Sequence, residues 1–146
     1  MGNVNDLQTN FFEGIIQMAK AKHQYTVSFP EELQHRIEQE VKNQNQDLKM
    51  NVINYNSKIN GILNVFYETE QCVSDIDTDR YNLKYDNEGN KINKLRHPVE
   101  FPKNLWDKLE EQKLESGFSI NEIIFFIVSD HFLKNDTKEE TTTEIQ

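Results

Sequence analysis

The sequence predicts a mainly helical fold with short β-strands, and three observations carry this prediction. Two short stretches end in a Phe-Pro pair, one at 23–30, where polar and apolar residues alternate, and one at 96–102. Each pair is followed by two stretches that repeat apolar residues at helical spacing. Matching positions lie 72 residues apart in the first part of this pattern and 61 apart in the second. The sequence therefore predicts a duplicated strand–helix–helix unit, with 11 (72 − 61) more residues between the helices of its first copy.

An amphipathic helix is expected first, within residues 1–22. Its apolar side chains recur at helical spacing, and they are Leu7, Phe11, Phe12, Ile15, Ile16 and Ala19. We expect this helix to lie outside the repeat.

The first copy is expected at 23–68. The apolar residues Tyr25, Val27 and Phe29 alternate with polar ones, which is typical of a half-buried strand. Pro30 stops the strand and suits the first turn of a helix. The apolar stripe of that helix is Leu33, Ile37 and Val41. A second helix is expected from near Ser57, with the stripe Ile59, Ile62, Leu63, Phe66 and Tyr67.

The second copy is expected at 96–134, after a linker at 69–95. Alternation around a turn at Gly89 predicts a β-hairpin over 81–95. In the copy itself, a helix striped by Leu105, Trp106, Leu109 and Leu114 is expected to end at Gly117. Ser119 and Glu122 form the capping-box pattern of a last helix, whose Ile and Phe residues we assign to the core. The polar residues 135–146 are expected to be disordered.

Composition limits the classes of function. The 146 residues suit one domain and include 16 basic and 25 acidic residues, a net charge of −9. This balance argues against a general polyanion-coating protein but leaves room for a small basic surface. Cys72 is the only cysteine, so no intrachain disulfide can form and a reducing, cytoplasmic location is expected. No apolar run is long enough to span a membrane, and no signal peptide is indicated.

No pattern of an enzyme or of a metal site stands out. The four histidines, at 23, 35, 97 and 131, have no partner at ligand spacing. Residues 75–79 resemble the start of a calcium loop, but Arg80 and Asp86 replace the glycine and glutamate that such a loop needs. Phosphate-binding loops and nucleophile motifs are not found, and Cys72 lies in an acidic stretch that does not favour a thiolate. We therefore expect no cofactor, no metal and no enzymatic activity.

The repeated unit resembles the ribbon–helix–helix superfamily, the MetJ/Arc/CopG group. Val99 to Leu133 matches its pattern, and Tyr25 to Tyr67 matches except for the long loop between the helices. The resemblance implies that the strands pair into an antiparallel two-stranded β-ribbon above a four-helix core. Both copies would form a tandem pseudo-dimer within one chain. Alternatively, each copy pairs with the same copy of a second chain, which gives an obligate dimer with two ribbons.

The resemblance also implies binding of double-stranded DNA, with the ribbon in the major groove. The base-contacting positions would be Gln24, Thr26, Ser28, Arg96 and Glu100, with Pro98 between the last two. Phosphate contacts would come from Lys20, Lys22, Ser57, Lys58, Lys94 and Ser119. Pro98 and Glu100 depart from the family pattern, since one lacks an N–H and the other brings a negative charge.

Two hypotheses of function follow. The first is a sequence-specific DNA-binding protein that acts as a transcriptional repressor or as an accessory factor of plasmid partition or conjugation, such as a relaxosome component. The alternative is an acidic protein-interaction module on the same fold, which binds a toxin, a nuclease or a relaxase, or mimics DNA. A basic potential confined to the ribbon would favour DNA, and a uniformly acidic surface would favour a protein partner.

Overall fold

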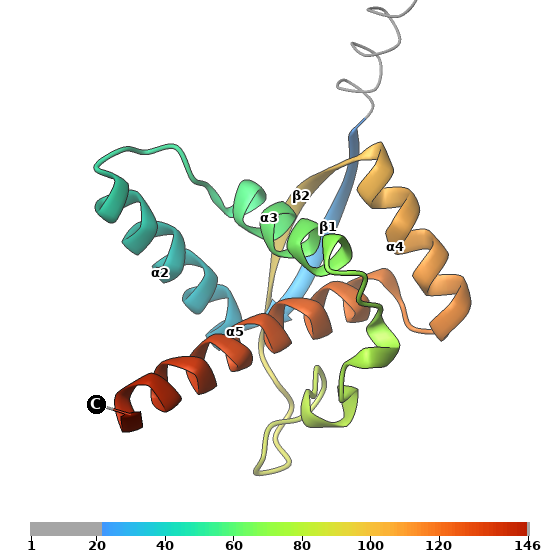
Figure 1. Cartoon of the computed structure of the whole chain (residues 1–146). Helices are drawn as coiled ribbons and strands as arrows, with labels where there is room; N and C mark the ends of the chain where they lie inside the picture. Colours follow the sequence, from blue (N-terminus) through green and yellow to red (C-terminus); the bar gives the residue numbers. More distant parts are fainter. Residues whose placement is uncertain (1–21, 146) are drawn as a thin grey trace, which may run out of the picture.

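The computed structural model describes residues 22–145, with their side chains as far as Thr137. The N-terminal helix expected at 1–22 lies outside the described residues apart from Lys22, and so does the phosphate contact expected at Lys20. Within the described range, the chain is mostly helical with one small sheet (Figure 1).

The sheet consists of β1 (Lys22–Pro30) and β2 (Lys94–Pro102), which pair antiparallel. Thr26 lies opposite Pro98 at the centre of the register. The antiparallel ribbon is therefore confirmed, and each strand begins earlier in the chain than the alternation predicts. Lys94 and Leu95 join β2 because they continue the pairing, opposite Pro30 and Phe29.

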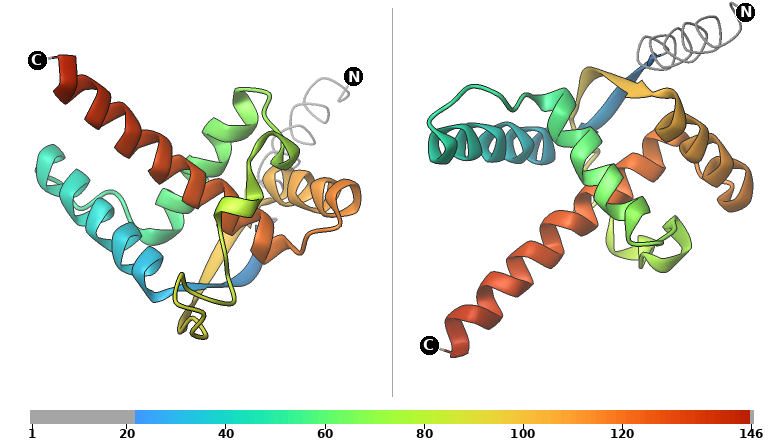
Figure 2. Two further views of the ribbon diagram at one scale, coloured as in Figure 1. Left: turned by 90° about the horizontal axis from the view of Figure 1, so that it is seen from below. Right: turned by 45° about the horizontal axis from the view of Figure 1, so that its top comes forward.

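Four α-helices and two short 3-10 helices, η1 (Val73–Asp75) and η2 (Thr78–Arg80), complete the described fold. The α-helices are the larger elements. They are α2 (Glu31–Leu48), α3 (Tyr55–Glu68), α4 (Lys103–Ser116) and α5 (Ile120–Ile145). The prolines that end the strands, Pro30 and Pro102, directly precede α2 and α4. Helices α3 and α5 cross over the ribbon, and α2 and α4 lie on opposite sides of it (Figures 1 and 2).

The hydrophobic core lies between the inner face of the ribbon and the helices. The inward residues Val27, Phe29, Val99 and Phe101 are at most 1% exposed. Each helix adds fully buried side chains to the same cluster: Ile37, Ile59, Leu63, Leu109, Ile123, Ile124 and Val128. The expectation that the Ile- and Phe-rich last helix is core is confirmed. Burial of this apolar area is the main force that holds the helices on the ribbon.

Side-chain caps set where the two central helices begin. In α3 the Asn54 Oδ1 accepts from the Ser57 N–H at 2.8 Å, and the Ser57 Oγ accepts from the Asn54 N–H at 2.9 Å. This reciprocal cap starts α3 at Tyr55, slightly before the expected start near Ser57. The capping box predicted for α5 is confirmed, since Ser119 and Glu122 exchange bonds of 3.1 Å.

Two sequence-based expectations differ from the structure. The hairpin expected over 81–95 is reduced to one isolated bridge between Tyr85 and Lys91. The reason is local: the Asn82 side chain accepts from the N–H groups of Lys84 and Tyr85, which bends the chain where a strand was expected.

The second difference is the tail. Residues 135–145, expected to be disordered, continue α5 to Ile145. Glycine and proline are absent from 134–145, so nothing there breaks the helix. The Asp136 carboxylate also accepts from the Arg36 guanidinium of α2, at 2.7 Å for one of the two bonds.

Candidate nucleic-acid interface

The outward face of the ribbon gathers the residues expected to contact bases. In a strand, alternate side chains point to opposite faces, and paired residues of neighbouring strands share a face. The inward face is the buried one, so the even-numbered residues point away from the core. We call this surface the ribbon face, and it comprises Lys22, Gln24, Thr26, Ser28, Lys94, Arg96, Pro98 and Glu100. All are exposed except the half-buried Ser28.

The charge of the ribbon face is opposite to that of the rest of the chain. The two strands contain three basic residues, Lys22, Lys94 and Arg96, and one acidic residue, Glu100. Their formal charge is therefore +2. The remainder of the chain has 13 basic (16 − 3) and 24 acidic (25 − 1) residues, a formal charge of −11. The positive charge is thus local to the surface that contains the predicted base contacts.

Glu100 is not an isolated negative charge. Its carboxylate lies 4.0 Å from the Lys22 ammonium, and both side chains are 54% exposed. An exposed pair of this kind stabilises the fold by only about 0–1 kcal/mol. The Lys22 ammonium and the Glu100 carboxylate can therefore each bind a ligand in place of the other with little loss of stability.

Pro98 fits because its missing N–H faces an outer edge of the ribbon. In an antiparallel pair, the backbone groups of alternate residues point toward the partner strand and away from it. The N–H groups of Ser28 and Glu100 bond to helix side chains outside the ribbon. Pro98 lies two residues before Glu100 and shares its orientation, so no bond of the ladder is lost.

Three asparagines hold these outer edges, and sequence reasoning assigned them no role. Asn121 of α5 accepts from the Ser28 N–H at 2.8 Å and donates to the Ser28 carbonyl at 2.9 Å. On the other strand, Asn60 donates to the Glu100 carbonyl at 2.9 Å, and Asn56 accepts from the Glu100 N–H at 2.6 Å. These asparagine clamps fix the ribbon to the first two turns of α3 and the first turn of α5. The only sequence signal is that Asn60 and Asn121 occupy matching positions, 61 apart.

The N–H groups proposed for phosphate binding are engaged within the protein. The Ser57 N–H donates to Asn54, the Lys58 N–H donates to the Asn54 carbonyl at 2.9 Å, and the Ser119 N–H donates to Glu122. Helix geometry leaves the earliest N–H groups of a helix without an intrahelical acceptor. In α3 and α5 these belong to Tyr55, Asn56, Ile120 and Asn121, and they are the better candidates for phosphate contacts.

Lys58 is turned away from a DNA-facing position. Its ammonium donates to the Gln44 Oε1 at 3.0 Å and lies 3.8 Å from a Glu40 oxygen of α2. Burial lowers the pKa of this amine, opposed by the neighbouring Glu40. The structure therefore does not place the Lys58 side chain with the ribbon face, whereas Lys22 and Lys94 lie on it.

Stacked rings attach both parts of the ribbon's inner side to the helices. The His23 ring stacks on Trp106 with centroids 3.7 Å apart, and the His97 ring stacks on Tyr55 at 3.8 Å. Burial raises the pKa of Tyr55, whose hydroxyl donates to Gln34. These contacts attach the ribbon to α3 and α4.

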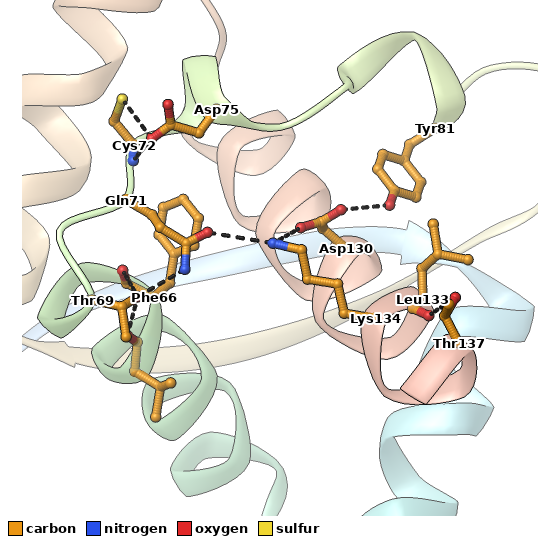
Figure 3. Close-up of polar contacts among 11 residues, drawn as sticks. Phe66, Thr69, Gln71, Cys72, Asp75, Tyr81, Asp130, Leu133, Lys134 and Thr137 are labelled. Carbon is orange, nitrogen blue, oxygen red and sulfur yellow. Dashed lines mark hydrogen bonds and ion pairs between the residues drawn. The ribbon is translucent and has the colours of Figure 1, made fainter. Parts of the chain in front are cut away.

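A cavity of about 160 Å³ lies between α3 and α5, and its lining includes Ile62, Phe66, Ile127 and His131. Its polar rim is occupied by internal contacts. Asp130 accepts from the Tyr81 hydroxyl and from Lys134, each at 2.9 Å, and Lys134 also contacts Gln71 (Figure 3). This network ties the linker at 69–81 to α5 and leaves the ribbon face as the better candidate site.

Comparisons with protein-family models, curated proteins and solved structures find no match for this chain. Within residues 22–145, no helix combines the length and apolarity needed to cross a membrane. Among the side chains that the structure describes, from Lys22 to Thr137, no group of three or more from His, Cys, Asp or Glu is placed to hold a metal ion.

Proposed function

We propose that this protein binds double-stranded DNA sequence-specifically, with the ribbon face in the major groove. The observation that carries the proposal is the charge of +2 on the ribbon strands of a chain whose net charge is −9. The biological role would be that of a repressor, or of an accessory factor in plasmid transfer or partition.

We also propose that the fold is a tandem ribbon–helix–helix pseudo-dimer. The register supports it: Thr26 pairs with Pro98, which is its own equivalent 72 (98 − 26) residues later. The clamps support it as well. Ser28 and Glu100 are 72 apart, and each has its N–H and its carbonyl bonded by asparagines near the start of a helix, Asn121 of α5 for Ser28 and Asn56 with Asn60 of α3 for Glu100. An internal two-fold axis through the central pair accounts for both coincidences.

The side chains of the ribbon face suit base edges. The major groove is about 12 Å wide and admits a two-stranded ribbon. Arg96 has two donors for the acceptors of guanine, Gln24 can pair with adenine, and Glu100 can accept from the amino group of cytosine. Lys22 and Lys94, at the ends of the strands, are placed to reach phosphates on either side.

The acidic remainder of the protein supports specific over general binding. Phosphate contacts give an affinity that does not depend on sequence, and the charge of −11 outside the ribbon opposes it. Affinity would therefore depend on a good fit of the ribbon to its own base pairs. We expect weak binding to unrelated DNA, in contrast to a basic DNA-coating protein.

Fluorescence anisotropy tests the proposal. The purified protein is titrated against labelled duplexes from the DNA upstream of its own gene and from neighbouring intergenic regions, at about 50 and about 200 mM salt. Binding that survives excess unrelated duplex, with a salt dependence equal to a few phosphate contacts, is the expected result. The absence of binding to every duplex at the lower salt would overturn the proposal and favour the acidic protein-interaction module, whose partner a pull-down would then identify.

A further inference from the structure

The two ends of the ribbon face differ in chemistry. At one end, Ser28 lies opposite Arg96, and we call this the Arg96 end. At the other, Gln24 lies opposite Glu100, and we call this the Glu100 end. An internal two-fold axis through Thr26 and Pro98 would superpose these ends, so any difference between them is a departure from the symmetry of the backbone.

This departure is confined to two positions away from the axis. Lys22 matches Lys94 at the start of each strand, and Pro30 matches Pro102 at its end, so the terminal residues of both strands are the same. Gln24 matches Arg96 and Ser28 matches Glu100, and these pairs are not alike. The strands are therefore equal where phosphates would lie and different where bases would lie.

The difference changes both charge and hydrogen bonding. The Arg96 end carries the cations Lys94 and Arg96 and has no acid on the ribbon face, whereas the Lys22 cation at the Glu100 end is balanced by Glu100 at 4.0 Å. A guanidinium only donates hydrogen bonds, and a carboxylate only accepts them. The guanidinium of Arg96 suits the two acceptors of guanine. The carboxylate of Glu100 suits the amino group of cytosine and is repelled by a base edge that presents only acceptors.

The structure also keeps the two ends from exchanging roles. Both strands belong to one chain, and each is clamped by a different helix, Asn121 of α5 on Ser28 and Asn60 of α3 on Glu100. A homodimer presents the same residues in both halves, but this chain has a fixed Arg96 end and a fixed Glu100 end.

We infer that this chain binds a non-palindromic DNA site in one orientation, with guanine in the half-site under Arg96 and a different half-site under Gln24 and Glu100. The inference rests on the proposed function. It adds that the DNA target is non-palindromic and that the protein binds it in one orientation. A palindrome would place one unsuitable half-site under one end of the ribbon. Each mismatched base pair lowers specific affinity by roughly 5- to 150-fold.

The target is tested by selection from a library of random duplexes, followed by anisotropy on three duplexes. One is the selected site, and the others are two palindromes made by doubling its left or its right half. The expected result is a non-palindromic site that binds at least about fivefold more tightly than either palindrome. A palindrome that binds as tightly as the selected site would overturn the inference but leave the proposed function standing. A library that yields no specific binder would overturn the proposed function itself.

A double substitution tests the cause on the protein side. Arg96→Gln together with Glu100→Ser gives β2 the outward residues of β1 at every position except the central Pro98, and it leaves the net charge unchanged. Both side chains are exposed, so the variant is expected to fold. Circular dichroism and thermal melting of the variant check this. Selection with this variant should yield a site with matching halves. The matched control, Glu88→Ser with Lys91→Gln, removes the same charges from the exposed linker and should keep the original preference. A variant that retains the original non-palindromic preference would overturn the inference.

Discussion

At the scale of single residues, the asparagine clamps explain why the ribbon stays in place. The outer edges of a two-stranded sheet present backbone groups that would otherwise need water or a partner. Asn121 bonds to both the N–H and the carbonyl of Ser28. At Glu100, Asn56 accepts from the N–H and Asn60 donates to the carbonyl. The clamps leave the side chains of the ribbon face available for a ligand.

Replacing Asn121 by alanine should destabilise the fold. The substitution leaves the half-buried N–H and carbonyl of Ser28 without their partner, so we expect the free energy of unfolding to fall by about 1–3 kcal/mol. Urea denaturation monitored by circular dichroism measures it. The control is Asn64→Ala, at an exposed position of α3, which should change the free energy by less than about 0.5 kcal/mol. Equal effects of the two substitutions would contradict the role of the clamp.

Arg96→Ala and Thr26→Ala should each weaken specific DNA binding by about 1–3 kcal/mol. The physical reason is the loss of a base-edge contact at an exposed position of the ribbon face. Anisotropy with the specific duplex measures the change, and Lys113→Ala, on the exposed surface of α4, is the charge-matched control for Arg96. Unchanged affinity in both ribbon variants would show that bases are not read by this face.

His131 should make the stability sensitive to mild acid. Burial, assisted by the cation of Lys58, lowers the pKa of its imidazole below the usual 6.5. The unfolded chain then takes up a proton at a pH where the folded chain does not, so the free energy of unfolding falls as the pH drops below about 6.5. Urea denaturation between pH 7.5 and 5.5 should show a smaller fall for His131→Gln than for the wild type. His35→Gln, at an exposed position of α2, should behave like the wild type.

Outward positions of a strand follow from local sequence, whereas contacts between distant residues do not. Gln24, Thr26 and Arg96 were placed on the outward face because alternation along a strand is a local property. Asn121 was not assigned, because its partner Ser28 lies 93 residues away and no local pattern encodes that distance. Lys58 was assigned to phosphate binding from its position near a helix start, whereas its side chain bends toward Gln44 of the preceding helix.

At the scale of elements, two glycines with the same open surroundings have opposite roles. Gly117 ends α4 with φ at +80°, a conformation that costs an L-residue about 1 kcal/mol or more. Gly61 lies within α3 in ordinary helical conformation. In both cases an added Cβ meets nothing within 4 Å.

The same substitution should therefore act in opposite directions at these two sites. Gly117→Ala should lower the free energy of unfolding by about 1 kcal/mol, because it strains the end of α4. Gly61→Ala should raise it by about 0.5–1 kcal/mol, because it reduces the freedom of the unfolded chain and favours helix. Thermal and urea melts of the pair measure both, each variant serving as the control of the other. A change of the same sign in both would be inconsistent with this backbone assignment.

Elements with strong local signals were predictable, and those that depend on context were not. The two strands, the four α-helices that follow them and the cap of α5 agree with their patterns, since prolines, caps and apolar stripes are local. The exception in the stripes is Leu114, which was expected to line α4 with Leu105, Trp106 and Leu109 but is 87% exposed. The hairpin expected at 81–95 does not form as a paired ribbon. Asn82 bends the chain at its start, and Lys94 and Leu95 pair with β1 instead. The helical tail was missed because composition alone does not reveal that Arg36 contacts Asp136.

At the scale of the whole molecule, β1 and β2 of one chain pair with each other and share one hydrophobic core with the four α-helices. In the alternative arrangement, with two ribbons shared between two chains, β1 would pair with β1 of a second chain and β2 with its β2. The pairing of β1 with β2 supports the single-chain arrangement.

The unfolding midpoint should therefore not depend on protein concentration. A monomer that unfolds in one step has the same thermal midpoint at any concentration, whereas an obligate dimer becomes more stable as its concentration rises. Melting curves over about a hundredfold range of concentration, together with sedimentation equilibrium, measure this. A midpoint that rises with concentration would favour the obligate dimer with two ribbons.

The separation of the two strands in the chain has a consequence for synthesis on the ribosome. Thr26 and its partner Pro98 are 72 residues apart, so β1 leaves the ribosome long before β2 exists. At about 5–20 residues per second, β1 waits roughly 4–14 s for its partner. During that interval its edge and the apolar residues Val27 and Phe29 have no native cover, and α2 and α3 have only half of their core. The nascent chain is therefore most exposed to aggregation and to chaperone binding between the completion of its first half and the release of β2.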